Sequence, residues 1–166
     1  VFATAIISGI WLVITALSGF WFGSIVDHLQ KKTAMMLSSL ASLVVYIICF
    51  GIYQFFPSDE FKNPTSPILW AFVLLLIVGV IAGNIRNIAI PTIVTVLFPA
   101  DKRDKANGLV GTAGGVSFLI TSVISGFLVG YSGMYHVLLL AIGATILAML
   151  DLLFINIPEG IASSQA

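Results

Sequence analysis

The chain has 166 residues, of which 59% are hydrophobic and only 8% are charged, with a mean hydropathy of +1.12. Soluble globular domains carry roughly 25% charged residues, so this composition indicates an integral membrane protein. The charges of the seven basic and seven acidic residues cancel, so the chain has no excess of positive charge that would attract nucleic acid. The single cysteine, Cys49, excludes an internal disulfide and a cysteine-based metal cluster.

Five apolar segments follow one another along the chain, and each is close to the ~20 residues that a helix needs to span a bilayer. A spanning helix satisfies its own backbone hydrogen bonds, whereas the connections between these segments carry nearly all the charge. The predicted fold class is therefore all-α integral membrane, with five transmembrane helices. They are expected over residues 6–26, 34–56, 68–97, 109–131 and 137–155.

The connection after the first segment places one carboxylate and two lysines between two apolar runs, with the spacing Gly-x-x-x-Asp-x-x-x-Lys-Lys. Acidic and basic groups this close together are expected where one membrane helix leaves the bilayer and the next one enters. A second glycine precedes the connection by one helical turn and predicts close helix packing. The residues concerned are Gly19, Gly23, Asp27, His28, Lys31 and Lys32.

Basic residues are concentrated in the first and third connections, which predicts that both lie in the cytoplasm. The second connection, residues 57–67, carries only one lysine, and the turn at 132–134 carries none, so both are expected outside. The chain begins within apolar sequence and without methionine, which favours a fragment that lacks an upstream helix. The basic residues of the first and third connections are Lys31, Lys32, Lys102, Arg103 and Lys105.

Asn84, Arg86 and Asn87 form a strongly polar cluster inside the third segment. At about 1.5 Å per residue, Arg86 lies roughly 17 Å from Leu97, and an arginine at that depth costs at least about 2.5 kcal/mol unless it faces protein or water. We expect it to point into the bundle, in a substrate or proton path. A structural arginine paired with a carbonyl or a carboxylate is the alternative. Pro91 predicts a bent or partly unwound helix nearby.

The fourth segment carries a row of small residues whose spacings of four, seven, four and four keep them on one helical face. Small residues let two helix backbones approach closely, so another helix is expected to pack there. Chance matches in a glycine-rich helix are the alternative. We call this row the α-helical stripe; its residues are Gly111, Gly115, Ser122, Gly126 and Gly130.

Nothing in the chain predicts catalysis. There is no pair of carboxylates, no nucleophile with a base, and no phosphate-binding loop, so no enzyme activity, cofactor or metal site is expected. Asp151 lies near the end of the last segment, where solvation at a helix end explains it. His28 and His136 lie at segment ends, where a solvated histidine is the ordinary interpretation.

The first connection resembles the cytoplasmic signature of the major facilitator superfamily, Gly-x-Leu-Ala-Asp-Arg-x-Gly-Arg-Lys. Gly23, Asp27 and Lys32 match it, and Lys31 stands in place of an arginine. Ile25 and Val26 replace the leucine and alanine, and the chain departs from the signature at two further positions, where an arginine and a glycine are replaced by His28 and Gln30.

A second match resembles the branch of the superfamily that contains macrolide and enterobactin exporters. It comprises Arg86 followed by Pro91, the sequence Leu-Phe-Pro at 97–99, and Lys-Ala-Asn-Gly-Leu at 105–109. The resemblance implies that the five segments correspond to helices two to six of a twelve-helix transporter. The first helix and the C-terminal half would then lie outside this chain.

The resemblance implies a secondary transporter of the bacterial cytoplasmic membrane that works by alternating access. Proton-coupled efflux of a small amphipathic compound is the expected activity, with the substrate, protons, the lipid bilayer and the C-terminal half as partners. Asp27 is expected to favour the outward-open state, and the two lysines after it to fix topology and bind anionic headgroups. An uptake transporter of the same superfamily, a non-transporting membrane scaffold, and a membrane enzyme with its catalytic residues elsewhere are the alternatives.

Overall fold

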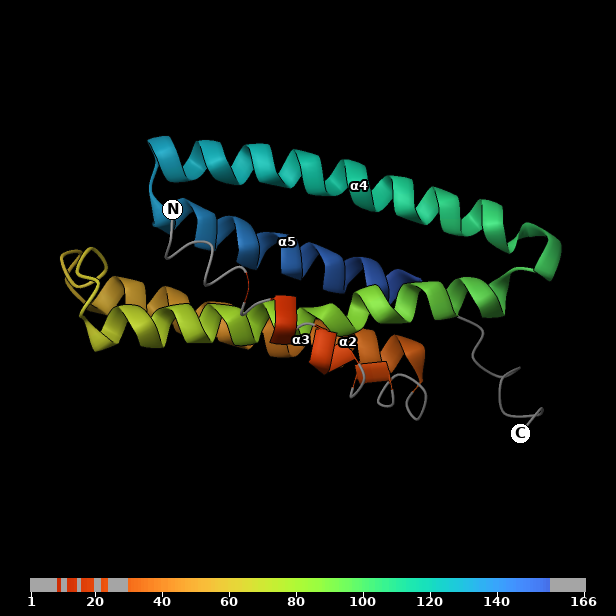
Figure 1. Cartoon of the computed structure of the whole chain (residues 1–166), viewed down its shortest axis with the longest axis horizontal. Helices are drawn as coiled ribbons and strands as arrows, with labels where there is room; N and C mark the ends of the chain where they lie inside the picture. The colour runs from red at the N-terminus through yellow and green to blue at the C-terminus, as the bar shows by residue number, and fades with distance from the viewer. Residues whose placement is uncertain (1–8, 10–11, 15, 20–21, 24–29, 156–166) are drawn as a thin grey trace.

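The computed structural model describes residues 9, 12–14, 16–19, 22–23 and 30–155 (Figure 1). Within this part the chain is helical, without strands, and the described residues between 9 and 23 are helical as well. Four helices are long and apolar enough to cross a membrane. The predicted all-α membrane fold is therefore confirmed. The four helices are α2 (Lys31–Phe55), α3 (Pro67–Leu97), α4 (Ala100–Tyr131) and α5 (Met134–Phe154).

Helix α3 lies within one residue of its predicted bounds, because both of its ends carry clear signals. The Ser66 side chain accepts a hydrogen bond from the Ile68 backbone N–H at 3.2 Å, and Pro67 occupies the first helical position. At the other end, Pro99 disfavours a helical conformation at Phe98, which is extended. These signals determine where the helix begins and ends, independently of its hydropathy.

Helix α4 begins at Ala100, nine residues before its predicted start at Leu109. The residues that hydropathy assigned to a connection include the good helix formers alanine, lysine and arginine, and Asp101 complements the dipole of the first turn. Helix α2 likewise begins at Lys31 instead of Ala34. At 32 residues and about 1.5 Å per residue, α4 is longer than the ~30 Å hydrocarbon core, so its charged first turns extend beyond it.

Helix α2 is the centre of the packing and contacts both α3 and α5. One core cluster lies near the start of α2, and another lies near its end, where Cys49 is fully buried against α3 and α5. In this cluster Phe72 of α3 and Leu138 of α5 are the buried partners. The cluster near the start of α2 comprises Ala34, Met35, Ala89 and Leu152.

Helix α4 lies along the outside of this packing, as Figure 1 shows. Of its 32 residues only Ala106 is buried. The helices α2 and α4 begin at the same end of the bundle at which α3 and α5 finish. We call this the basic end, because Lys31, Lys32 and the charged first turns of α4 lie there.

Candidate functional site

Small residues bring α2 and α3 close together. The Ser42 Oγ donates a hydrogen bond to the Gly79 carbonyl at 2.8 Å, and the Ser38 Oγ donates to the Ala82 carbonyl. Both serines are buried. Serine side chains that bond to a neighbouring helix satisfy their own polar groups in an apolar layer and add to the packing of the two helices.

Gly79 and Gly83 make this approach possible. A Cβ atom at Gly79 would lie 2.9 Å from Tyr46 Cε1 and 3.1 Å from Val45 Cγ1, and one at Gly83 would lie 3.1 Å from Ser42 Oγ. Side chains at these two positions would force the helices apart. Sequence reasoning missed this contact, although two signals could have found it: glycines four residues apart in α3 and serines four residues apart in α2.

Arg86 follows Ala82 by four residues and Gly79 by seven. It therefore shares a face of α3 with this contact. Its side chain is half-buried, and it lies within electrostatic range of the Tyr46 hydroxyl on α2. Among the described residues, no carboxylate lies within ion-pair distance of the guanidinium. A fixed cation in the middle of a spanning helix therefore has no anionic partner in this part of the chain.

Asn84 and Asn87 lie one turn apart on α3, beside Arg86. The Asn87 Nδ2 donates to the Asn84 Oδ1 at 3.3 Å, and Asn87 is exposed on the helix surface. The helix continues without interruption through Pro91, so the unwinding expected there is not present. Proline cannot donate to the Asn87 carbonyl, which leaves a backbone acceptor next to the two amides.

At the basic end, Lys32 joins the start of α2 to the end of α5. Its Nζ donates to the carbonyls of Leu153 at 3.3 Å and Ile155 at 2.7 Å. The last carbonyls of a helix lack partners within the helix, and a cation there also complements the negative end of the helix dipole. Lys31 is half-buried beside it, whereas Asp27 and His28 lie outside the described residues.

The glycines of the α-helical stripe lie on the open side of α4. Apart from neighbours in the same helix, no described atom lies within 4 Å of the position that a Cβ would take at any of them, and the same is true of Gly19 and Gly23. Ser122 is exposed. No described helix covers the stripe, so close packing at these residues stays a prediction. The stripe glycines are Gly111, Gly115, Gly126 and Gly130.

The chemistry available within the described residues is that of binding and packing. No group of three or more His, Cys, Asp or Glu side chains in this part could hold a metal ion. Away from the helix ends, the polar side chains of the described spanning helices are an arginine, amides and hydroxyls, which can recognise an anion or a hydrogen-bonding ligand.

A comparison with protein families matches residues 1–165 of the chain to the family described as Major Facilitator Superfamily. Comparisons with curated proteins and with solved structures found no match. The match covers nearly all of the chain and agrees with its apolar, membrane-spanning helices. The superfamily is a family of transporters, not of enzymes. The chain belongs to the Major Facilitator Superfamily and is a multi-pass membrane protein of the secondary-transporter class.

Proposed function

We propose that this protein exports a small amphipathic compound across the bacterial cytoplasmic membrane in exchange for protons, by alternating access. The resemblance of residues 23–32 and 105–109 to the macrolide and enterobactin exporter branch supports efflux over uptake. In this proposal the chain supplies helices two to six of a twelve-helix transporter. The C-terminal half would supply the other wall of the substrate path.

The proposal rests mainly on the position of Arg86 inside a spanning helix. A guanidinium in the middle of a spanning helix is always charged, and burying it without a partner is expensive. Within the described residues it has no carboxylate partner. We propose that it faces the substrate path, and that Asn84 and Asn87, on a different face of α3, line a neighbouring part of that path. In the path, Arg86 would bind an anionic group of the substrate, or hold a proton-carrying carboxylate of another helix in its ionised form.

The packing of α3 explains how Arg86 would be held in position. Gly79 and Gly83 fix α3 against α2 before the arginine, and Ala89, which is fully buried, fixes it one turn after. Because contacts with α2 flank Arg86 on both sides, its backbone cannot shift without loss of packing. A rigidly held cation is what discrimination between substrates requires.

The basic end would control the conformational change. We propose that Asp27 favours the outward-open state by binding the amides at a helix N-terminus. The contact from Lys32 to the end of α5 supports a coupled movement, since it ties the start of α2 to a second helix. We propose further that the α-helical stripe, Gly19 and Gly23 pack against helices outside the described residues.

The test is transport by the intact protein in proteoliposomes with an imposed proton gradient. We expect Arg86→Gln to lower proton-driven efflux at least about tenfold, while accumulation and thermal unfolding stay unchanged. Arg86→Lys should restore transport only in part, because the bidentate fork is lost. Lys62→Gln is the matched control, since Lys62 is exposed and its ion pair with Asp59 at 3.9 Å lies in the 57–67 loop.

Four results would contradict the proposal. Normal transport by Arg86→Gln, with unchanged dependence on the gradient, would remove the arginine from the path. Failure of that variant to accumulate would favour a structural ion pair. Substrate movement in the same direction as protons would show an uptake transporter, and a folded wild-type protein that moves no compound would favour a scaffold.

A further inference from the structure

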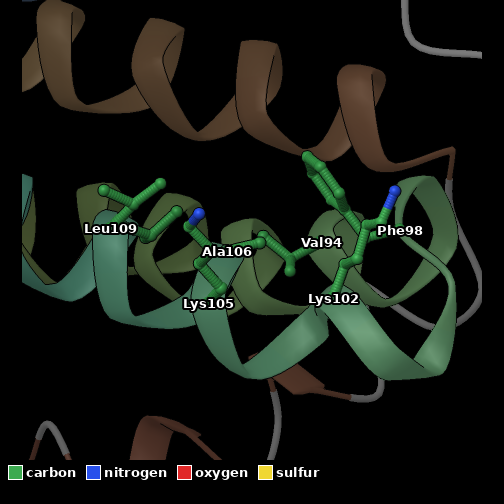
Figure 2. Close-up of a pocket in the computed structure, with 7 residues that line it drawn as sticks. Val94, Phe98, Lys102, Lys105, Ala106 and Leu109 are labelled. Carbon is green, nitrogen blue, oxygen red and sulfur yellow. The ribbon is translucent and has the colours of Figure 1, made fainter.

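A cavity of about 380 Å³ lies at the basic end between the last turn of α3 and the first turns of α4 (Figure 2). It lies within the range of about 300–1,000 Å³ that small-molecule sites occupy. Apart from two lysines, the side chains that line it are apolar. The lining residues are Val94, Phe98, Lys102, Lys105, Ala106, Leu109 and Val110.

Lys102 and Lys105 place two positive charges on one side of this cavity. They are three residues apart and therefore neighbours on the helix surface, and both are exposed. Neither forms an ion pair with a described residue. The acidic residues of the same turns, Asp101 and Asp104, do not line the cavity. The two ammonium groups are thus uncompensated where the cavity meets the aqueous phase.

The other charged groups near the cavity leave its positive charge in place. The Nε of Arg103 donates to the Phe98 carbonyl at 3.0 Å, which adds a third positive charge to the turn between α3 and α4. Phe98 itself is 41% exposed. The turn therefore presents a basic, partly apolar surface and not a neutral one.

We expect the cavity to lie at the depth where a bilayer changes from headgroups to hydrocarbon. The charged first turns of α4 precede the apolar sequence that begins at Leu109, which is 65% exposed. In Figure 2 the Lys102 nitrogen lies beside Phe98 and the Lys105 nitrogen lies on the side of Leu109, so a lysine flanks the apolar lining at each end. An apolar surface flanked by ammonium groups fits the acyl chain and the phosphate of a lipid.

We infer that this cavity binds an anionic phospholipid of the adjacent leaflet. The phosphate lies between the ammonium groups of Lys102 and Lys105, and one acyl chain lies against Val94, Phe98 and Leu109. A soluble anion would leave the apolar lining unused, and a zwitterionic lipid would leave two positive charges uncompensated. A bound lipid would also fill the space between α3 and α4, where protein contacts are sparse.

The inference can be tested with the intact protein in nanodiscs that contain phosphatidylglycerol with a photoreactive group on one acyl chain. A phosphatidylcholine probe with the same chain is the reference. We expect phosphatidylglycerol to label residues 94–110 about tenfold more than phosphatidylcholine, since each basic residue near the surface strengthens anionic-lipid binding several-fold. Lys102→Gln with Lys105→Gln should remove the difference, and Lys102→Arg with Lys105→Arg should keep it.

The control is Lys62→Gln, which removes a charge in the 57–67 loop, away from the basic end, and should leave the labelling unchanged. Leu109→Gln keeps both lysines and should lower labelling by weakening the apolar lining. Equal labelling by the two lipids, or full labelling of the double glutamine variant, would overturn the inference. So would displacement of the probe by inorganic phosphate, which would indicate a site for a soluble anion.

Discussion

Helices α3 and α4 both carry glycines four residues apart, yet only those of α3 are covered. Gly79 and Gly83 lie against Tyr46, Val45 and Ser42 of α2, whereas the glycines of the α-helical stripe have no atom within 4 Å. The covered face is therefore part of the packing within this chain. The open face has the same spacing but no partner among the described helices.

The difference shows that the spacing of glycines permits close packing but does not select a partner. Helix α2 supplies two buried serines four residues apart, which donate to the backbone carbonyls of Gly79 and Ala82. A glycine on one helix allows close packing only when the facing helix carries a small or hydrogen-bonding residue. In α2 and α3 both conditions are met.

The largest expected effect is that of Gly79→Leu, which tests whether the covered face is essential for packing. The new Cβ would lie 3.1 Å from the Val45 side chain, which is branched and cannot easily move. We expect a loss of about 2 kcal/mol in the free energy of unfolding. The midpoint of denaturant unfolding in detergent measures it.

Gly143→Leu in α5 is the control, since no atom lies within 4 Å of its Cβ position. Its unfolding midpoint should stay close to that of the wild type. If Gly79→Leu and Gly143→Leu have the same midpoint, the α2–α3 contact does not distinguish the two faces, and the comparison fails.

The fold could be predicted well from the sequence where membrane burial and helix signals coincide. Pro67 and Ser66 precede an apolar run, and α3 begins there. The start of α4 could not be found in this way, because hydropathy reports what lies in the membrane and not what is helical. The polar residues 100–108 continue the helix beyond the hydrocarbon core, and no hydropathy window reveals that.

A smaller effect is expected from removal of the two serine hydroxyls that join α2 to α3. Ser38→Ala with Ser42→Ala removes both interhelical hydrogen bonds and should destabilise the protein by about 1 kcal/mol, at about 0.6 kcal/mol for each bond. Ser39→Ala is a closely matched control. Ser39 is fully buried on the same helix, and its hydroxyl has no hydrogen-bond partner among the described residues.

Removal of the unpartnered Ser39 hydroxyl should be neutral or slightly stabilising. Chemical unfolding of the three proteins side by side measures the difference. A larger loss from Ser39→Ala than from the double variant would show that the hydrogen bonds contribute little, and that the volume of the serines determines the packing.

The candidate site could be predicted in part. Arg86 was recognised because a charge inside an apolar run is conspicuous, whereas Ser38 and Ser42 were overlooked because serine is common in membrane helices. Their role depends on which carbonyls of α3 they face, and no local pattern specifies that. Lys32 was expected to act on headgroups, but its contact with the end of α5 joins residues more than 120 positions apart.

A modest effect is expected from Lys32→Met, which removes the cation at the end of α5. Two hydrogen bonds to carbonyls and the favourable interaction with the helix dipole are lost, so we expect a loss of about 0.5–1 kcal/mol. Hydrogen exchange of the last turn of α5 should become faster. Lys31→Met is the control, and an equal change in α5 exchange for both variants would show that charge alone matters.

The smallest effect on stability is expected from Gly115→Leu, which tests the open face directly. No described atom lies within 4 Å of the new Cβ, and leucine favours a helix over glycine by up to about 0.8 kcal/mol. The unfolding midpoint of the protein should therefore not fall. If Gly115→Leu destabilises the protein as much as Gly79→Leu, the stripe is covered and the contrast between the two faces disappears.

Transport by Gly115→Leu gives a second test of the difference between the covered face of α3 and the open face of α4. If the stripe packs against another part of the transporter, Gly115→Leu should lower transport at least about fivefold while the protein remains folded, because two backbones are held apart where they must approach. Leu119→Ala, on an exposed position of the same helix, should leave transport unchanged. Equal transport by both variants would mean that the stripe glycines face lipid. The open face of α4 would then differ from the covered face of α3 in function as well as in packing.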